Sequence, residues 1–190
     1  MTARRTRIER GDPRGWLDMF SEIQRRFLLW SLVRRIRKRG WTGIFVHNYE
    51  DGMVPFAYSM GFWEALGTPE VIMFGMPDHV AIQLLERIYG AIETGALALV
   101  DKATWTLSEG DESWTLAWRA VHPSQIRWKY FNLAIWYRMR QSVGLRGLEA
   151  FQLFASDKAG KFPWEEGHDA DYQPRQPELY LPYFGPADED

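Results

Sequence analysis

The chain contains no cysteine among its 190 residues. This absence excludes disulfide bonds, thiol nucleophiles and zinc or iron–sulfur centres held by thiolates. The chain also lacks an apolar run near the roughly 20 residues that a membrane-spanning helix needs, because arginines bracket the longest candidate, residues 27–33. Its first residues lack the basic, apolar and small-residue order of a signal peptide. We therefore expect a cytoplasmic protein without a transmembrane segment.

Several motifs of enzymes and metal proteins are missing as well. No two histidines lie three or four residues apart, so their spacing predicts no metal site. The chain has neither the G-K-[ST] end of a phosphate-binding loop nor a G-x-S-x-G nucleophile turn. The motifs therefore identify no catalytic residue and no cofactor, and they leave the question of enzyme activity open. The four histidines are His47, His79, His122 and His168.

Aromatic residues and unevenly distributed charge are prominent in this chain. Aromatic residues make up 15% of the sequence and include ten tryptophans. Residues 1–40 hold twelve Arg and Lys against four Asp and Glu, whereas residues 157–190 hold nine acids against three bases. We expect three regions: a basic arm and amphipathic helix over residues 1–39, an α+β domain over 40–166, and an acidic, proline-rich tail over 167–190.

The basic region predicts a helix from Asp12-Pro13 to about Lys38, ended by Gly40. Its apolar residues recur at spacings of three and four, which predicts one apolar face of the helix. A helix of this kind either packs on the domain with its arginines in solvent, or binds a membrane surface or nucleic acid. No zinc-finger, homeodomain or RNP motif supports nucleic acid. The predicted face comprises Trp16, Phe20, Ile23, Phe27, Trp30 and Val33.

The rest of the chain predicts short strands interrupted by helices. Asp51-Gly52 indicates a hairpin turn, and the Gly- and Pro-containing stretch 61–69 indicates a loop before the third strand. Because hairpins dominate, we expect an α+β fold with a largely antiparallel sheet of about five to six strands and three flanking helices. A partly closed barrel is an alternative form of this sheet. The expected strands are 41–49, 54–60, 71–76, 96–107, 113–121 and 148–155, and the expected later helices are 77–93 and 124–143.

Short motifs follow one another along residues 40–166. They are Gly40-Trp41, Pro55–Phe62 (P-F-A-Y-S-M-G-F), Pro69-Glu70, Phe74–Pro77 (F-G-M-P), Gln152-Leu153, and Asp157 followed by Gly160–Trp164 (G-K-F-P-W). In this combination the chain resembles the bacterial domain-of-unknown-function family 4262. Ser156 departs from the family pattern, which often has proline there. Because that family has no established activity, the resemblance implies a common fold and the place of a site, but no reaction.

These motifs supply the candidate ligand-binding residues. Tyr58 and Ser59 offer hydroxyl groups, and Gly61 would let a ligand approach the backbone. Each candidate also has a structural explanation: Glu70 as a buried partner or strand-edge cap, and Trp164 as a cover on the core. Glu70 and Asp157 would form an acid–base pair only at a separation of about 5–9 Å. The predicted site comprises Tyr58, Ser59, Gly61, Trp63, Glu70, Asp157 and Trp164.

Three hypotheses of function follow from these features. The first is a ligand- or partner-binding accessory domain with a pocket around the Y-S-M-G and F-P-W motifs, whose partner is an unidentified small molecule or protein. The second is a flavin-type oxidoreductase or another small-molecule enzyme, which rests on the element order of split-barrel flavin binders. The third is nucleic-acid or membrane-surface binding through the arginine-rich first helix. The many aromatic residues are also compatible with a homodimer.

Overall fold

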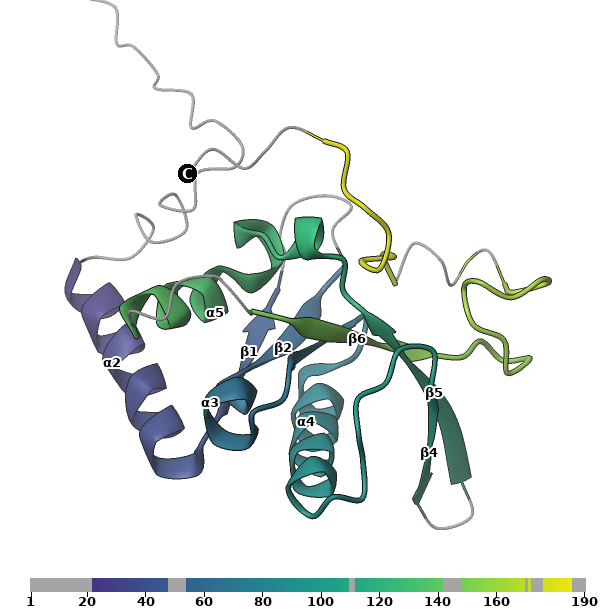
Figure 1. Ribbon diagram of the computed structural model, residues 1–190, viewed down its shortest axis with the longest axis horizontal. Helices are drawn as coiled ribbons and strands as arrows, with labels where there is room; N and C mark the ends of the chain where they lie inside the picture. The colour runs from purple at the N-terminus through teal and green to yellow at the C-terminus, as the bar shows by residue number, and fades with distance from the viewer. Residues whose placement is uncertain are drawn as a thin grey trace, which may run out of the picture.

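The protein is built on one open, six-stranded sheet with the strand order β1-β2-β3-β6-β5-β4 (Figure 1). The computed structural model describes residues 22–47, 54–109, 112–141, 148–169, 171 and 176–185. Strands β3 and β6 pair in parallel, and the other neighbouring strands pair antiparallel. This arrangement confirms the predicted α+β fold with a largely antiparallel sheet. The strands are β1 (Thr42–Val46), β2 (Phe56–Met60), β3 (Glu70–Phe74), β4 (Thr104–Glu109), β5 (Glu112–Ala120) and β6 (Ala150–Ala155).

Helices cover both faces of this sheet. The helix α4 packs on one face, where its Leu85 and Ile88 join a core cluster with Val71 of β3. The helices α2 and α5 contribute to the core of the other face, which includes Ile72 of the same strand. Every residue of β2 and β3 is buried, because central strands covered on both sides need apolar residues at consecutive positions. The helices are α2 (Glu22–Arg39), α3 (Phe62–Leu66), α4 (Asp78–Glu93) and α5 (Trp128–Arg140).

Three stretches differ from the sequence prediction. The predicted loop 61–69 contains the short helix α3, which lies between two glycines with positive φ, Gly61 and Gly67. The predicted strand 96–107 begins only at Thr104, because the preceding residues pack irregularly against the α4 side of the core and turn at Lys102, whose φ is 66°. The predicted helix 124–143 is replaced by a 3-10 turn and then α5, which bends at Phe131 (φ −128°, ψ 26°). The hairpin turn at Asp51-Gly52 lies outside the described residues.

The packed face of α2 also differs from the prediction. Of the predicted face, Val33 packs on the core, whereas Phe27 is 68% exposed and Trp30 is 55% exposed. The residues of α2 that are buried are Leu32 and Ile36. The reason is that α2 carries two apolar stripes with helical spacing, and sequence periodicity alone does not show which of them meets the sheet. The side chains of Trp16, Phe20 and Ile23 lie outside the described residues.

Part of the predicted C-terminal tail packs on the body of the protein. The side-chain amide of the buried Gln152 donates to the Pro177 carbonyl at 2.6 Å and accepts from the Leu179 N–H at 3.0 Å. Gln176 makes a similar two-way contact with the backbone of Ala155. Leu179 is thereby buried in the same core cluster as Leu32 of α2. Among the helices that the structure describes, none combines the length and the hydropathy of a membrane span.

Candidate functional site

The Y-S-M-G and P-E motifs meet in a buried hydrogen-bond network around Glu70. The Ser59 hydroxyl donates to one carboxylate oxygen of Glu70 at 2.5 Å, and the Gly61 N–H donates to the other at 2.9 Å. The Phe62 N–H adds a contact at 3.3 Å. Ser59 Oγ itself accepts from the Val71 N–H at 2.8 Å, which leaves its hydrogen for Glu70. We call Ser59, Gly61 and Glu70 with these contacts the Glu70 network.

The Glu70 network is closed to solvent. Ser59 is fully buried and Glu70 is 2% exposed. Burial raises the pKa of Glu70 above its usual value of 4.5, and the hydrogen bonds from Ser59 and the Gly61 N–H oppose that shift. The carboxylate satisfies N–H groups at the start of α3, which would otherwise lack partners. This chemistry stabilises the turn from β2 into α3 and offers no free group to a ligand.

Gly61 allows this turn to form. Its φ of +108° lies in a region that residues with a side chain rarely adopt. A Cβ at this position would lie 2.7 Å from the Gly40 carbonyl oxygen and 3.1 Å from the Trp41 Cα. Gly61 therefore brings the start of α3 directly against the segment that joins α2 to β1. The G-W and Y-S-M-G motifs are thus neighbours in space.

Tyr58 links the sheet to the bend in α5. Its hydroxyl donates to Oδ1 of Asn132 at 2.9 Å and accepts from the Leu133 N–H at 3.2 Å. The backbone at Phe131 is not helical, so the bend leaves N–H groups that need other partners. Burial raises the pKa of Tyr58, so the phenol stays protonated and keeps donating at neutral pH. This role is structural.

Trp63 lies on the surface beside the Glu70 network. Its side chain is 37% exposed, and the guanidinium carbon of Arg138 lies 5.3 Å from its ring centroid. Arg138 is buried and lies 3.4 Å from a carboxylate oxygen of Glu64. Trp63 therefore covers a buried arginine from the solvent side, while its backbone N–H lies 3.5 Å from a carboxylate oxygen of Glu70. The fold brings together five residues of the predicted site: Tyr58, Ser59, Gly61, Trp63 and Glu70.

Asp157 organises a turn at the other end of the sheet. It accepts the N–H groups of Ala159 and Lys161 at 2.8 Å each, and that of Asp169 at 2.9 Å. These hydrogen bonds, first that from Lys161, lower the pKa of Asp157 below its usual 3.8. Asp157 follows the end of β6, whereas Glu70 begins the parallel strand β3. Six strand residues separate the two by about 20 Å, which does not suit an acid–base pair.

Trp164 belongs to an aromatic cluster near Asp157. Its ring stacks on Phe162 at 5.2 Å and meets the ring of Phe154 edge-on at 5.1 Å. The guanidinium carbon of Arg119 lies 4.9 Å from the Trp164 ring centroid and 3.7 Å from that of Tyr180. Trp164 thus covers this end of the core, as its structural explanation predicted, and already holds a cation against its face.

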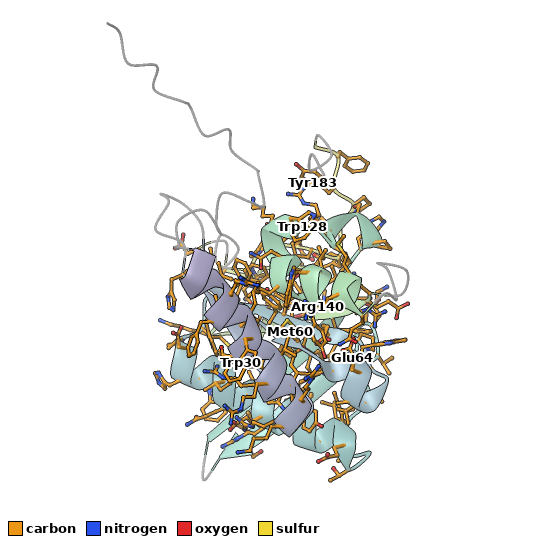
Figure 2. All side chains as sticks on the ribbon, turned by 90° about the vertical axis from the view of Figure 1, so that its left-hand side faces the viewer. Trp30, Met60, Glu64, Trp128, Arg140 and Tyr183 are labelled. Atoms are coloured by element: carbon orange, nitrogen blue, oxygen red, sulfur yellow. The ribbon has the colours of Figure 1, made fainter. Side chains whose placement is uncertain are left out.

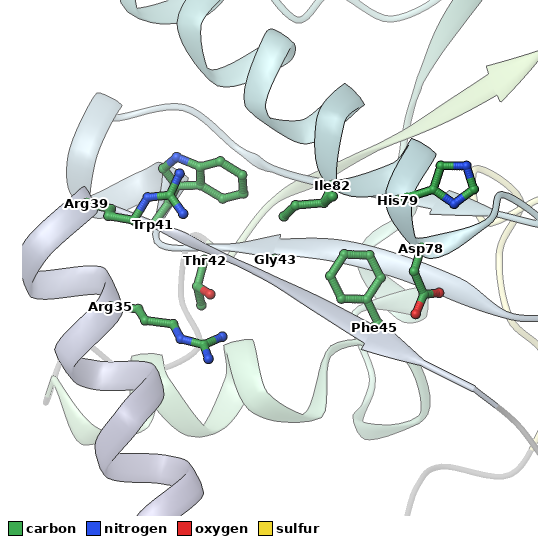
Figure 3. Close-up of a pocket in the computed structure, with 9 residues that line it drawn as sticks. All are labelled: Arg35, Arg39, Trp41, Thr42, Gly43, Phe45, Asp78, His79 and Ile82. Carbon is green, nitrogen blue, oxygen red and sulfur yellow. The ribbon is translucent and has the colours of Figure 1, made fainter.

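A surface hollow of about 590 Å³ lies between α2, β1 and α4 (Figure 3). Figure 3 shows Arg35 and Arg39 on the α2 side, the backbone of β1 along the floor, and Ile82 on the α4 side. The floor belongs to an edge strand, so about half of its N–H and C=O groups point away from β2. We call this feature the β1 hollow. Its lining residues are Arg35, Arg39, Trp41, Thr42, Gly43, Phe45, Asp78, His79 and Ile82.

The charged groups of the β1 hollow differ in how they are paired. Arg39 contacts Glu86 at 2.9 Å, but both side chains are about half exposed. At the opposite end, Asp78 contacts His47 at 2.8 Å. Arg35 is exposed and has no ion-pair partner among the residues that the structure describes. The α2 side of the hollow therefore carries positive charge that is available to a ligand.

The β1 hollow and the Glu70 network lie on neighbouring strands, β1 and β2. In the antiparallel register, Thr42 faces Met60 and Gly43 faces Ser59. Ser59 of the Glu70 network therefore lies on the strand next to the floor of the hollow. Sequence reasoning missed the hollow itself; the available signal was the pair Arg35 and Arg39, four residues apart on a helix that ends beside an edge strand. Within the described ranges, no three His, Cys, Asp or Glu residues gather as a metal site would need.

Comparison with known proteins gives a family and no activity. The model of the family called domain of unknown function DUF4262 matches residues 35–169, which is more than two thirds of the chain. The chain therefore belongs to the DUF4262 family, as its motifs indicated. It matches no curated protein and no solved structure. The match covers the Glu70 network, the β1 hollow and the Asp157 turn together.

Proposed function

We propose that this DUF4262 domain is a ligand-binding accessory domain that holds a small organic anion in the β1 hollow. The observation that carries the proposal is the position of Arg35 and Arg39 on one side of the hollow. Guanidinium groups bind carboxylates and phosphates through paired hydrogen bonds. Arg35 has no competing ion pair among the described residues, and the pair of Arg39 with Glu86 is exposed and therefore weak.

The remaining surfaces of the hollow suit the rest of such a ligand. The half-buried rings and chains of Phe45 and Ile82 offer apolar contact. Thr42 contributes a hydroxyl group, and the free edge of β1 contributes backbone donors and acceptors. A volume of about 590 Å³ lies within the usual range for small-molecule sites. The ligand class that fits is an anion with a flat or apolar portion.

In this proposal the family motifs support the site from behind. The Glu70 network fixes the end of β2 against β1 through the pairs Met60 with Thr42 and Ser59 with Gly43. A pocket at Tyr58 and Ser59 themselves would require both residues, which are fully buried, to become accessible. The proposal therefore keeps the predicted binding function and moves the ligand outward by one strand.

The test is an NMR titration of the ¹⁵N-labelled full chain with AMP, FMN, phenyl phosphate and citrate. We expect at least one probe to shift the amide signals of Thr42 and Gly43. The double variant Arg35→Ala/Arg39→Ala should bind about tenfold or more weakly, because it loses charge-assisted hydrogen bonds. The matched control is Arg140→Ala, an exposed arginine on α5, which should bind as the wild type does.

Three outcomes would contradict this proposal. No probe binds at millimolar concentration, the Arg35 and Arg39 variant binds as tightly as the wild type, or the shifts gather at the Asp157 turn instead. The FMN arm also addresses the oxidoreductase hypothesis. FMN that binds with a changed flavin absorbance and is reduced by a nicotinamide donor would favour that enzyme, whereas equal binding of all flat anions would favour a simple ligand-binding domain.

A further inference from the structure

We infer that the outer face of α2 is a docking surface for an anionic membrane. We define the α2 outer face as Phe27, Trp30, Arg34 and Lys38, which recur at spacings of three and four on one side of the helix. In Figure 2, α2 lies at the front of the molecule with Trp30 labelled on it. The inference is separate from the β1 hollow, which uses Arg35 and Arg39.

The aromatic residues of this face are unusually open to solvent. Phe27 is 68% exposed and Trp30 is 55% exposed, and the adjacent Leu28 is 39% exposed. The rings of Phe27 and Trp30 lie near each other, with centroids 6.1 Å apart. The helix holds itself to the sheet through its opposite side, where Leu32 and Ile36 are buried. Packing on the described domain therefore does not explain Phe27 and Trp30.

Positive charge surrounds these exposed rings. Residues 26–39 contain six Arg and Lys and no Asp or Glu. The guanidinium carbon of Arg34 lies 5.2 Å from the Trp30 ring centroid, so a cation and an aromatic ring share one spot on the surface. A partner for this face must therefore supply both negative charge and an apolar environment.

An anionic lipid surface meets both requirements at once. Phe, Trp and Leu side chains insert at the boundary between head groups and acyl chains, while Arg and Lys bind the phosphate and carboxylate groups above. Each basic residue near such a surface strengthens binding several-fold at moderate ionic strength. Nucleic acid would satisfy the cations, but it would leave Leu28 and much of Phe27 without an apolar partner. The observations therefore favour lipid.

The test is flotation of the full chain with vesicles of phosphatidylcholine alone and of phosphatidylcholine mixed with phosphatidylserine. We expect binding only to the anionic vesicles, and release as salt is raised. The variant Phe27→Ser/Trp30→Ser and the variant Arg34→Glu/Lys38→Glu should each reduce binding roughly tenfold or more. These side chains are exposed, so the folded state should persist, which circular dichroism would verify.

The matched control is Met139→Ser/Arg140→Glu, which changes an exposed apolar residue and an exposed cation on another helix. It should bind anionic vesicles as the wild type does. The inference is overturned if the wild type binds neither vesicle type, if the α2 variants bind unchanged, or if the control loses binding equally. It is also overturned if the chain retains a duplex DNA or RNA oligonucleotide in the same buffer and ignores the vesicles.

Discussion

The Glu70 network and the β1 hollow are neighbours that differ in almost every physical respect. The network is buried, is satisfied by hydrogen bonds and is built from family motifs. The hollow is open and lies mostly outside those motifs, and its arginines have a weak ion pair or none among the residues that the structure describes. Only the pairing of β1 with β2 separates them. The comparison teaches that a recognisable motif can mark the scaffold of a site, while the binding groups lie on the next strand.

Among the variants that test this comparison, we expect Glu70→Ala to have the largest effect on stability. The change leaves the Ser59 hydroxyl and the Gly61 and Phe62 N–H groups buried without an acceptor. We expect the free energy of unfolding to fall by about 3–5 kcal/mol, measured by urea denaturation. The control Glu86→Ala removes an exposed ion pair and should cost less than about 1 kcal/mol. Equal losses in the two variants would contradict a structural role for Glu70.

A smaller but still large effect is expected for Gly61→Ala. The added methyl group meets the Gly40 carbonyl oxygen, and φ must leave +108°. We expect a loss of about 2–4 kcal/mol in unfolding free energy. Gly67→Ala is the matched control, because its φ is also positive but a Cβ there has nothing within 4 Å. That control should lose only about 1 kcal/mol, and a larger loss than for Gly61 would argue against the close approach at Gly40.

Tyr58→Phe should have a moderate effect. It removes the hydroxyl that contacts Asn132 and the Leu133 N–H, but it keeps the ring in the core. We expect a loss of about 1–2 kcal/mol. Tyr89→Phe is the control, because among the described residues its hydroxyl has no hydrogen-bond partner, and it should change stability little. A Tyr58 variant as stable as the control would show that α5 does not depend on this contact.

The pH dependence of stability should distinguish the two carboxylates that the sequence grouped together. Because burial raises the pKa of Glu70, the folded state binds more protons than the unfolded chain just above pH 4.5. Its contribution to stability is therefore fully present below that pH and is lost as pH rises through the folded pKa. The unfolding free energy of Glu70→Gln, measured with urea across this pH range, should not show that decrease. A pH profile identical to that of the wild type would contradict a raised pKa at Glu70.

Asp157 should show the opposite sign. Its pKa is lowered by backbone hydrogen bonds, so the folded state binds fewer protons than the unfolded chain near pH 3.8. The stability it contributes is present above that pH and is lost as pH falls through the folded pKa. Asp157→Asn should flatten the acid side of the unfolding profile. If Asp157→Asn and Glu70→Gln altered the pH dependence of stability in the same direction, the opposite pKa shifts of the two carboxyl groups would be contradicted.

We expect the smallest effect on stability from a substitution in the β1 hollow. Arg35→Ala removes an exposed side chain without a described ion pair, so the unfolding free energy should change by less than about 0.5 kcal/mol. Its effect should appear in the affinity for the anion instead. A clear loss of stability in this variant would mean that Arg35 supports the fold rather than a ligand.

The sequence predicted the larger elements of the fold well, since apolar runs and turn residues specify them locally. β5 and β6 lie where alternation and buried runs placed them, and Pro77 precedes α4 as expected. The parallel pairing of β3 with β6 was not predicted, because it joins strands about 80 residues apart along the chain. Local patterns carry no information about such a contact.

The candidate site was predicted in part. The Y-S-M-G and P-E motifs do meet around Glu70, but Asp157 and Trp164 lie at the far end of the parallel strands. The error has a physical cause: β6 runs in the same direction as β3, so a motif after its end cannot reach the start of β3. The predicted apolar face of α2 packs on the core only at Val33 among its described side chains, because the helix has two apolar stripes of the same period. Only the position of the sheet shows that Leu32 is inside and Trp30 outside.

The most direct test of this account measures the affinity of Glu70→Gln and of Arg35→Ala for the anion that binds the wild type. Both variants are compared at a temperature where circular dichroism shows them folded. The account predicts that Glu70→Gln is less stable but binds with wild-type affinity, whereas Arg35→Ala is as stable as the wild type but binds about tenfold more weakly. The reverse pattern would place the ligand at the Glu70 network and contradict the proposal.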